Sequence, residues 1–190
     1  RQMKLILASG SPRRRELLGF CTKEFDVCVS EFDEHTVQAP TPAALAGALA
    51  RGKCLAVAAS HPGCVVVGSD TVVELDGEVF GKPQDADDAR RMLRALSGRT
   101  HEVHTGVCVS DGARTESFVD TCKVTFFPIP EAELERCIAS GEPFDKAGAY
   151  AIQGRAALWL DRLEGDYYTI MGLPVSRTAR LLDRFNLEKR

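Results

Sequence analysis

The chain has 190 residues, of which 44% are hydrophobic and 27% are charged, so it suits one globular domain or two closely joined lobes. Its net charge of −3 provides no bulk basic field for nucleic acid, so any anion site must be a local gathering of Arg and Lys. No apolar stretch approaches the roughly 20 residues that span a bilayer. We therefore expect neither a nucleic-acid partner nor a membrane, and we expect no signal peptide.

The seven cysteines favour a reducing compartment. Their number is odd, their spacing is wide, and no C-x-x-C pair is present. Most lie in apolar runs, so we expect buried free thiols in the cytoplasm rather than disulfides or a zinc site. The four histidines show no metal-binding spacing on a helix, and we assign them no role.

The first segment joins a short apolar run to a basic helix start. Residues 5–8 predict a buried strand, Ser11 suits a helix N-cap, and Pro12 suits the first helical position. The first-turn amides and the helix dipole favour an anion, yet residues 13–15 are all arginine, the wrong charge for the dipole. A polyphosphate would resolve this conflict, because Arg binds phosphate bidentately. Solvated surface is the alternative. The segment is neither a Walker A loop nor a Rossmann fingerprint.

The middle of the chain alternates helices and strands, and long strands follow. We expect a strand at 25–29, an acidic loop at 30–35, a helix at 43–59 capped by Thr41, a strand at 64–68 and a hairpin of 72–75 with 78–80. Beyond it we expect a helix at 84–96, strands at 100–110 and 116–127, a helix at 131–140, a Gly/Ala-rich loop at 146–154, a strand at 156–163 and a helix at 174–185. This order predicts a mixed sheet in an α/β protein, with helices on its faces.

Asp70 is the sharpest acidic candidate. We expect it directly after the strand at 64–68, and open α/β sheets bind ligands beyond the carboxyl ends of their strands. Ser9 is expected at another such end. If the two strands are parallel neighbours, the proposed anion-binding segment at residues 9–15 and Asp70 share one crevice. The alternative is a strand-end turn in which Asp70 only accepts backbone N–H groups.

Two lysines and an acidic loop are candidates for the same site. Lys82 lies between Gly81 and Pro83, and Lys53 lies in an otherwise apolar helix, where it needs a partner such as a phosphate or a carboxylate. The acidic loop at 30–35 offers carboxylates for the divalent ion that polyphosphate hydrolysis usually needs. For these groups the alternative is an ordinary solvated surface.

Gln153 is a candidate for base recognition. It lies between Ile152 and Gly154 in a segment too small and too apolar for a flexible surface loop. Its amide has both a donor and an acceptor, as reading a nucleobase edge requires. Tight turns and core packing are the alternative for this segment.

A set of motifs along nearly the whole chain resembles the Maf family, the nucleoside triphosphate pyrophosphatases also called septum-formation proteins. In family order, the motifs are LASGSPRR (7–14), GSDTV (68–72), GKP (81–83), LSGRTH (96–101), KAGAY (146–150) and GLP (172–174). The chain departs from the family pattern at Ser69, where Ala is frequent. One such motif would be weak, but the ordered set is specific.

The resemblance implies an elongated mixed β-sheet flanked by helices, in two lobes with a central cleft, similar to inosine triphosphate pyrophosphatases. It implies that residues 1–190 form a single domain. It further implies cleavage of a nucleoside triphosphate between the α- and β-phosphates, to the monophosphate and pyrophosphate, with a divalent metal ion, Mg²⁺ or Mn²⁺. A homodimer is also expected from the resemblance.

The resemblance also implies roles for individual residues. Asp70 matches the proton acceptor or a metal ligand, and Glu34 matches an acidic position near the metal. Phosphate-handling positions of the family match Ser9, Arg13, Arg14, Lys53 and Lys82. Its substrate-selecting positions match Arg13, Thr71 and Gln153, in the combination of the dTTP/UTP branch. The branch that acts on 7-methyl-GTP typically has Trp at the first of these positions.

Other functions stay open on the sequence alone. One is a pyrophosphatase for another nucleotide, such as a modified pyrimidine nucleotide or 7-methyl-GTP. Another is a nucleotide-binding regulator of cell division with little turnover. Asp70 together with Lys53, Lys82 and Arg13 favours catalysis, because a sensor needs no acid beside the scissile phosphate. A purely structural domain is a poor fit to this many charged residues at strand ends.

Overall fold

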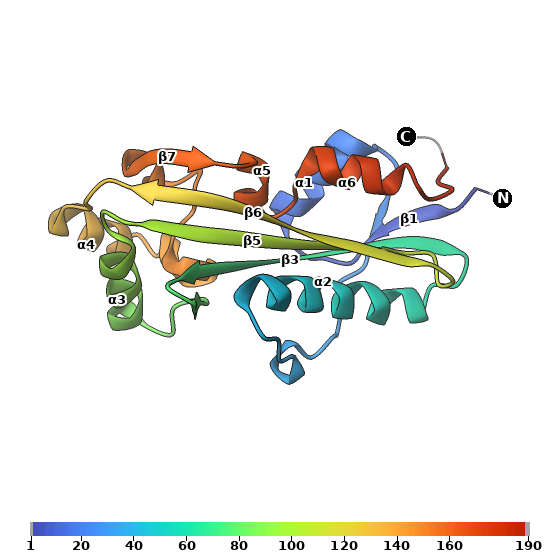
Figure 1. Cartoon of the computed structure of the whole chain (residues 1–190), viewed down its shortest axis with the longest axis horizontal. Helices are drawn as coiled ribbons and strands as arrows, with labels where there is room; N and C mark the ends of the chain where they lie inside the picture. The colour runs from blue at the N-terminus through green and yellow to red at the C-terminus, as the bar shows by residue number, and fades with distance from the viewer. Residues whose placement is uncertain (1, 189–190) are drawn as a thin grey trace.

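The computed structural model describes residues 2–188, and it shows a long mixed sheet flanked by helices (Figure 1). The strands are β1 (Lys4–Leu7), β2 (Asp26–Val27), β3 (Cys64–Leu75), β4 (Glu78–Phe80), β5 (Thr100–Ser110), β6 (Thr115–Phe126) and β7 (Leu160–Glu164). The helices are α1 (Pro12–Cys21), α2 (Pro42–Ala59), α3 (Ala86–Leu96), α4 (Glu131–Ala139), α5 (Tyr167–Met171) and α6 (Val175–Leu182). The predicted elongated mixed α/β architecture is confirmed.

The strand order is β2-β1-β3-β5-β6-β7, with β4 paired to β3 off this path. β1 and β3 are parallel neighbours, as expected, whereas β3, β5, β6 and β7 pair antiparallel. Alternate residues of β3 face opposite sides of the sheet. Val66 packs in the cluster that α2 covers, whereas Val65 and Val67 pack in the larger core with α1, α3 and α6.

The helix starts follow the predicted chemistry. The Ser11 hydroxyl accepts a hydrogen bond from the Arg14 amide, and the Thr41 hydroxyl accepts one from the Ala44 amide. Each bond satisfies a first-turn N–H that has no partner within the helix. The Asp76-Gly77 turn joins β3 to β4 as the hairpin signal predicted.

Helix α2 lies unusually close to the sheet because glycines face it. A Cβ at Gly68 would lie 2.7 Å from the Ala50 carbonyl oxygen, and a Cβ at Gly106 would overlap the Ala46 carbonyl. By length and composition α2 could also cross a membrane, with 18 residues and a mean hydropathy of 1.2. A core helix passes the same test, and α2 packs here against β3 and β5.

Three predicted elements need correction. The strand expected at 64–68 continues to Leu75, because β5 pairs with it without interruption from Val66 to Glu74. The strand expected at 156–163 starts with a 3-10 turn at Arg155–Leu158, and β7 follows it. The strand expected at 25–29 is shorter, because only Asp26 and Val27 pair with β1. The thiols of Cys54, Cys108, Cys122 and Cys137 are buried, as expected, whereas those of Cys21, Cys28 and Cys64 are only partly buried.

Candidate active site

A gap in one edge of the sheet creates the site. On the edge of β3 away from β5, β1 pairs as far as Val67 and β4 pairs from Val73. Neither strand pairs with residues 68–72 on that edge, because the chain leaves β1 through Ser9 and enters α1. Asp70 is therefore not beyond a strand end, as the sequence suggested, but in the middle of β3 beside this gap.

A cavity of about 630 Å³ opens at the gap. It brings together eight of the nine residues that the sequence singled out: Ser9, Arg13, Arg14, Glu34, Lys53, Asp70, Thr71 and Lys82. The ninth, Gln153, is exposed and is not among the lining residues, although its neighbour Ile152 is.

Lys53 links the two acidic candidates. Its Nζ lies 2.7 Å from Glu34 Oε1 and 3.1 Å from Asp70 Oδ2. The side chains of Lys53 and Asp70 are 17% and 14% exposed, whereas that of Glu34 is 52% exposed. The other Asp70 oxygen, Oδ1, accepts a 2.7 Å hydrogen bond from the Thr71 amide. The partner that the sequence required for Lys53 is thus a pair of carboxylates.

The loop that carries Glu34 is held against α2 by an aromatic contact. The Phe32 ring lies over Gly52, so close that a Cβ at Gly52 would overlap the ring. The following residue in the helix is Lys53, and Glu34 lies two residues beyond Phe32. The absence of a side chain at Gly52 therefore lets the acidic loop approach the lysine.

Arg14, which also lines the cavity, is held in place by two hydrogen bonds. Its Nε donates to the Gly172 carbonyl at 2.8 Å, and its Nη2 donates to Thr71 Oγ1 at 2.9 Å. Burial lowers the pKa of the Arg14 guanidinium, and the nearby Asp70 carboxylate opposes that shift. Ser69, the departure from the family pattern, donates to the same Gly172 carbonyl at 2.8 Å.

The Thr71 hydroxyl takes part in two hydrogen bonds with neighbouring side chains. It accepts from Arg14 and lies 2.9 Å from Thr105 Oγ1, which itself donates to the Thr169 carbonyl. Because the single Thr105 proton goes to Thr169, Thr71 donates to Thr105. The chain of bonds leads from Arg14 through the sheet to α5, so Thr71 positions the guanidinium.

The sequence matches one protein family along nearly its whole length. The family model described as Maf-like protein matches residues 4–185. The chain belongs to this family. It is 46% identical over 183 residues to the dTTP/UTP pyrophosphatase of Bacillus cytotoxicus, with 96% of each chain covered. It is 45% identical over 185 residues to the dTTP/UTP pyrophosphatase of Bacillus velezensis, covering 97% of this chain and 98% of that protein.

Solved structures with the same fold have much lower sequence identity to this chain. The Staphylococcus aureus Ham1 protein aligns with a TM-score of 0.56 at 13% identity, covering 95% of this chain and 98% of that one. A HAM1 protein from Coxiella burnetii aligns with a TM-score of 0.50 at 12% identity, covering 96% and 100%. At these identities the likeness shows the fold, which is the one that the resemblance implied.

The Maf-like motifs also contribute cavity residues that received no role from the sequence. Lys146, the first residue of the KAGAY motif, lines the cavity with Asp145, and its Nζ lies 2.9 Å from Asp145 Oδ1. This contact lowers the pKa of the Asp145 carboxyl. Part of the cavity wall is apolar and comes from Tyr150, Ile152, Ile170 and Met171. The strong motif match at 146–150 was the available signal for Lys146.

The acidic pair suits a hard divalent cation. Glu34 Oε1 and Asp70 Oδ2 lie around the same ammonium group, so both oxygens are close enough to share one cation. Mg²⁺ and Mn²⁺ prefer such oxygen ligands, and Mg²⁺ is commonly held by one or two carboxylates plus substrate phosphates. The residues present therefore fit the metal that the resemblance implied.

Proposed function

We propose that this Maf-like protein is a metal-dependent nucleoside triphosphate pyrophosphatase that hydrolyses dTTP and UTP to the monophosphate and pyrophosphate. The relatives named above carry this activity in their names. The observation that carries the proposal is the Glu34–Lys53–Asp70 arrangement inside a cavity lined with cations. The proposed role is removal of nucleotides from the cytoplasmic pool, as a house-cleaning enzyme.

The charge of the cavity suits a triphosphate. Five cationic side chains line it, against the three carboxylates of Glu34, Asp70 and Asp145. The cations are Arg13, Arg14, Lys53, Lys82 and Lys146. Fixed cations stabilise the charge that develops on the phosphoryl oxygens in the transition state and neutralise the departing pyrophosphate. In this role Arg14 acts with a preset orientation, because Gly172 and Thr71 hold its guanidinium.

Asp70 is the proposed catalytic carboxylate. The Thr71 amide holds one of its oxygens, which leaves Oδ2 directed at Lys53 and the cavity. A carboxylate fixed in this way can orient or deprotonate a water molecule that attacks the α-phosphorus. Lys53 holds the two carboxylates close together, and its ammonium is available to a phosphate oxygen once substrate enters.

Glu34 and Asp70 are the residues that would hold Mg²⁺ or Mn²⁺. When bound, the ion would withdraw charge from the phosphates. Glu34 is the more exposed of the two and belongs to a short 3-10 turn, Glu34–Thr36, whose position depends on the Phe32 contact. We therefore expect the metal affinity to depend on how this turn docks on α2.

Arg13 and Gln153 are the proposed substrate-selecting residues, whereas Thr71, the third position that the resemblance implied, is proposed to position Arg14. Arg13 and Thr71 line the cavity, whereas Gln153 must reach into it from an exposed position next to Ile152. If Gln153→Ala leaves the preference for dTTP over GTP unchanged, base recognition lies elsewhere in the cavity. The wall formed by Tyr150 and Ile152 would then be the next candidate.

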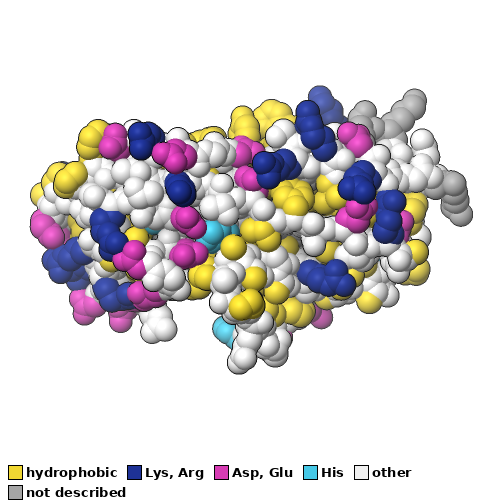
Figure 2. Space-filling model, viewed as in Figure 1, with side chains coloured by type: hydrophobic (Ala, Val, Ile, Leu, Met, Phe, Trp, Pro, Cys, Tyr) yellow, Lys and Arg dark blue, Asp and Glu magenta, His cyan; other side chains and the backbone are white. Residues whose placement is uncertain are grey.

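The family resemblance extends the proposal to the whole molecule. We propose that residues 1–190 act as a single domain of two lobes, because β3, β5 and β6 run through its full length (Figure 1). Side chains of both charges are interspersed on the face in Figure 2. We also propose that the protein is cytoplasmic and forms a homodimer. Light scattering of the purified protein measures its molar mass and tests the dimer.

A panel of nucleotides tests the proposed activity. The purified protein is incubated with Mg²⁺ or Mn²⁺ and each of dTTP, UTP, CTP, GTP, ATP and 7-methyl-GTP, and the products are separated by chromatography. Monophosphate and pyrophosphate, chiefly from dTTP and UTP, support the proposal. Diphosphate and orthophosphate would mean that the cleaved bond is wrongly assigned. Tight binding with no product would instead favour a nucleotide-binding regulator.

A further inference from the structure

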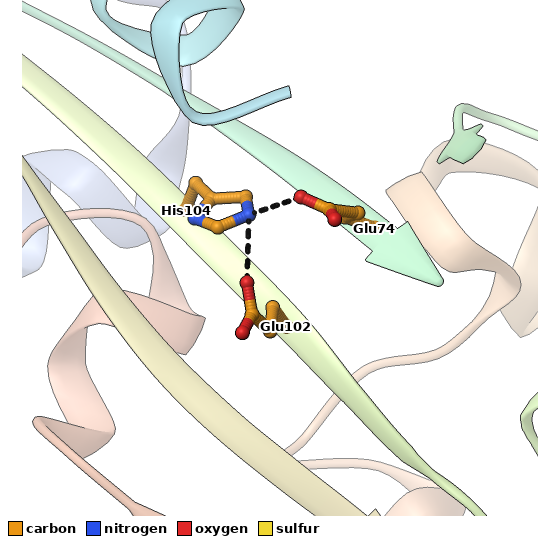
Figure 3. Close-up of side chains that lie close together, drawn as sticks. All are labelled: Glu74, Glu102 and His104. Atoms are coloured by element: carbon orange, nitrogen blue, oxygen red, sulfur yellow. Dashed lines mark hydrogen bonds and ion pairs between the residues drawn. The ribbon is translucent and has the colours of Figure 1, made fainter. Parts of the chain in front are cut away.

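A second group of ligand-type side chains lies on β3 and β5, away from the cavity lining. Glu74 and Glu102 are register partners on the two strands, and His104 is two residues from Glu102, so all three share one face of the sheet. Figure 3 shows both carboxylates directed at the His104 ring, one from each strand. One ligand atom from each residue lies within 4.8 Å of the others.

The His104 ring is buried and oriented. Its side chain is only 3% exposed, and Nδ1 lies 2.7 Å from the hydroxyl of Thr121 on β6. Nε2 lies 2.8 Å from Glu74 Oε1 and 3.4 Å from Glu102 Oε2. When Nδ1 carries a hydrogen and donates it in a hydrogen bond to the Thr121 hydroxyl, the lone pair of Nε2 faces the two carboxylates. Only a proton or a metal cation between Nε2 and the carboxylate oxygens then relieves the electrostatic repulsion among them.

The spacing matches a metal coordination shell. Bonds of about 2.1 Å at tetrahedral or octahedral angles place neighbouring ligand atoms about 3.0–3.4 Å apart. The two distances from Nε2, 2.8 and 3.4 Å, bracket this range. One imidazole and two carboxylates suit Zn²⁺, Mn²⁺, Fe²⁺ or Co²⁺ better than Mg²⁺, which prefers oxygen ligands alone.

The charge around the group leaves room for a cation. Within residues 2–188, the only ion pairs that involve Glu74 or Glu102 are those with His104. Lys123 is the register partner of Glu102 on β6 and is exposed, but it forms no ion pair with either glutamate. Both glutamates are partly exposed, so a cation and its water ligands can reach the site from solvent.

We propose that Glu74, Glu102 and His104 bind one divalent transition-metal ion, separately from the acidic pair of the candidate active site. Glu74 lies four positions beyond Asp70, which is about 13 Å along β3. The ion would tie β3 to β5 near the N-terminal end of α2, whose Ala46 packs on Val72. It would thereby stabilise the strand that carries Asp70, and it touches no part of the reaction.

A Zn²⁺ titration by calorimetry tests this site. We use Asp70→Asn as the background, because this change weakens the other candidate metal site. This protein is expected to bind one Zn²⁺ per chain at the second site. Adding Thr121→Val should weaken binding by roughly 10–100-fold, as loss of an outer partner of a metal-bound histidine does, and adding Glu102→Gln should weaken it more. Glu164→Gln, across Lys123 on the same face, is the matched control and should leave the affinity unchanged.

Histidine-selective ¹⁵N NMR identifies the ligand atom in the unmodified protein. His104→Gln assigns the resonance, and Glu102→Gln, at a partly exposed position, serves if that variant does not fold. Zn²⁺ is expected to shift Nε2 of His104 while Nδ1 keeps its proton. If both nitrogens stay protonated at saturating Zn²⁺, His104 is an imidazolium paired with two glutamates, and the metal site is wrong. Equal Zn²⁺ affinity with and without Glu102→Gln would also contradict it.

Discussion

Lys53 Nζ lies 3.1 Å from Asp70 Oδ2, and this contact joins a helix to the middle of the strand that it covers. Glycines at the interface of α2 and the sheet allow the two elements to approach closely, as at Gly68 and Gly106. The same ammonium also contacts Glu34, from a loop that docks on the helix through Phe32. Residues from the acidic loop, α2 and β3 thus meet around one ammonium group beside the open edge of β3.

Asp70→Asn should reduce turnover while the protein stays folded. We expect kcat for dTTP to fall by at least ~10²-fold, because the amide neither accepts a proton nor holds a metal as a carboxylate does. Steady-state kinetics with the purified variant measure the effect. Asp87→Asn, at an exposed position on α3, is the control and should keep normal turnover. A folded Asp70→Asn protein with near-normal turnover would remove Asp70 from the mechanism.

Gly52→Ala should separate the acidic loop from α2. The new methyl group would overlap the Phe32 ring, so the ring and the turn with Glu34 must move away from Lys53. We expect a higher metal concentration for half-maximal activity, measured with Mg²⁺ and Mn²⁺ titrations at saturating dTTP. The double variant Gly52→Ala with Phe32→Ala should recover part of the loss.

Gly19→Ala is the matched control for that experiment. Gly19 lies in α1, and a Cβ there would meet no atom within 4 Å, so this change should raise helix stability by up to about 1 kcal/mol. It should leave the metal dependence unchanged. If Gly52→Ala shows the metal dependence of Gly19→Ala, the docking of Phe32 does not position Glu34.

Thr71→Val should disturb substrate binding through Arg14. The hydroxyl that accepts from Nη2 and donates to Thr105 is lost, so the guanidinium loses this bond and keeps the one to the Gly172 carbonyl. We expect KM for dTTP to rise more than kcat falls, and the effect should reach UTP and CTP alike. Thr100→Val, at an exposed pair with Thr125, is the control. A change confined to the preference among bases would instead assign Thr71 to base recognition.

His101 should make the fold sensitive to acid. Burial lowers the pKa of His101 to about 4 from an ordinary value of 6.5, and its Nε2 lies 2.6 Å from the buried Tyr150 hydroxyl. The folded state holds the ring neutral while the unfolded chain takes up a proton below 6.5, so stability falls as pH drops from 6.5 towards 4. At pH 5 the loss is about 2 kcal/mol relative to pH 7.

Urea unfolding at pH 7 and pH 5 measures this contribution. His101→Gln should lower stability at pH 7, because it removes the packing and the bond to Tyr150, but it should lose about 2 kcal/mol less between the two pH values than the unmodified chain. His61→Gln, at a more exposed position after α2, should keep the full pH dependence. Identical pH dependence in the unmodified chain and His101→Gln would contradict the account.

Short sequence patterns predicted the features that depend on neighbouring residues in the chain. The caps at Ser11 and Thr41, the Asp76-Gly77 turn and the long strands β5 and β6 all follow from short sequence patterns. The end of β3 did not, because its continuation past Asp70 depends on pairing with β5, whose partner residues lie 28 to 34 positions further along the chain. The eight residues chosen from motifs line one cavity, but Asp70 lies inside a strand and not beyond its end.

The second cluster shows the other limit of the sequence. The histidines were compared with helical metal spacing, but Glu102 and His104 lie on a strand, where residues two apart share a face. Glu74 joins them only through the β3–β5 register. The alternation of side chains along the strand expected at 100–110 places Glu102 and His104 on one face. That Glu74 lies beside them follows only from the observed pairing of β3 with β5.

The direct test of the central claim is hydrolysis of dTTP in ¹⁸O-labelled water by the unmodified enzyme and by Asp70→Asn. Mass spectrometry then locates the label. Attack at the α-phosphorus beside Asp70 predicts that ¹⁸O enters the monophosphate, with unlabelled pyrophosphate, and that Asp70→Asn forms this product at least ~10²-fold more slowly. Label in the pyrophosphate, or release of diphosphate and orthophosphate, would contradict the assignment of the reacting atom and of the carboxylate beside it.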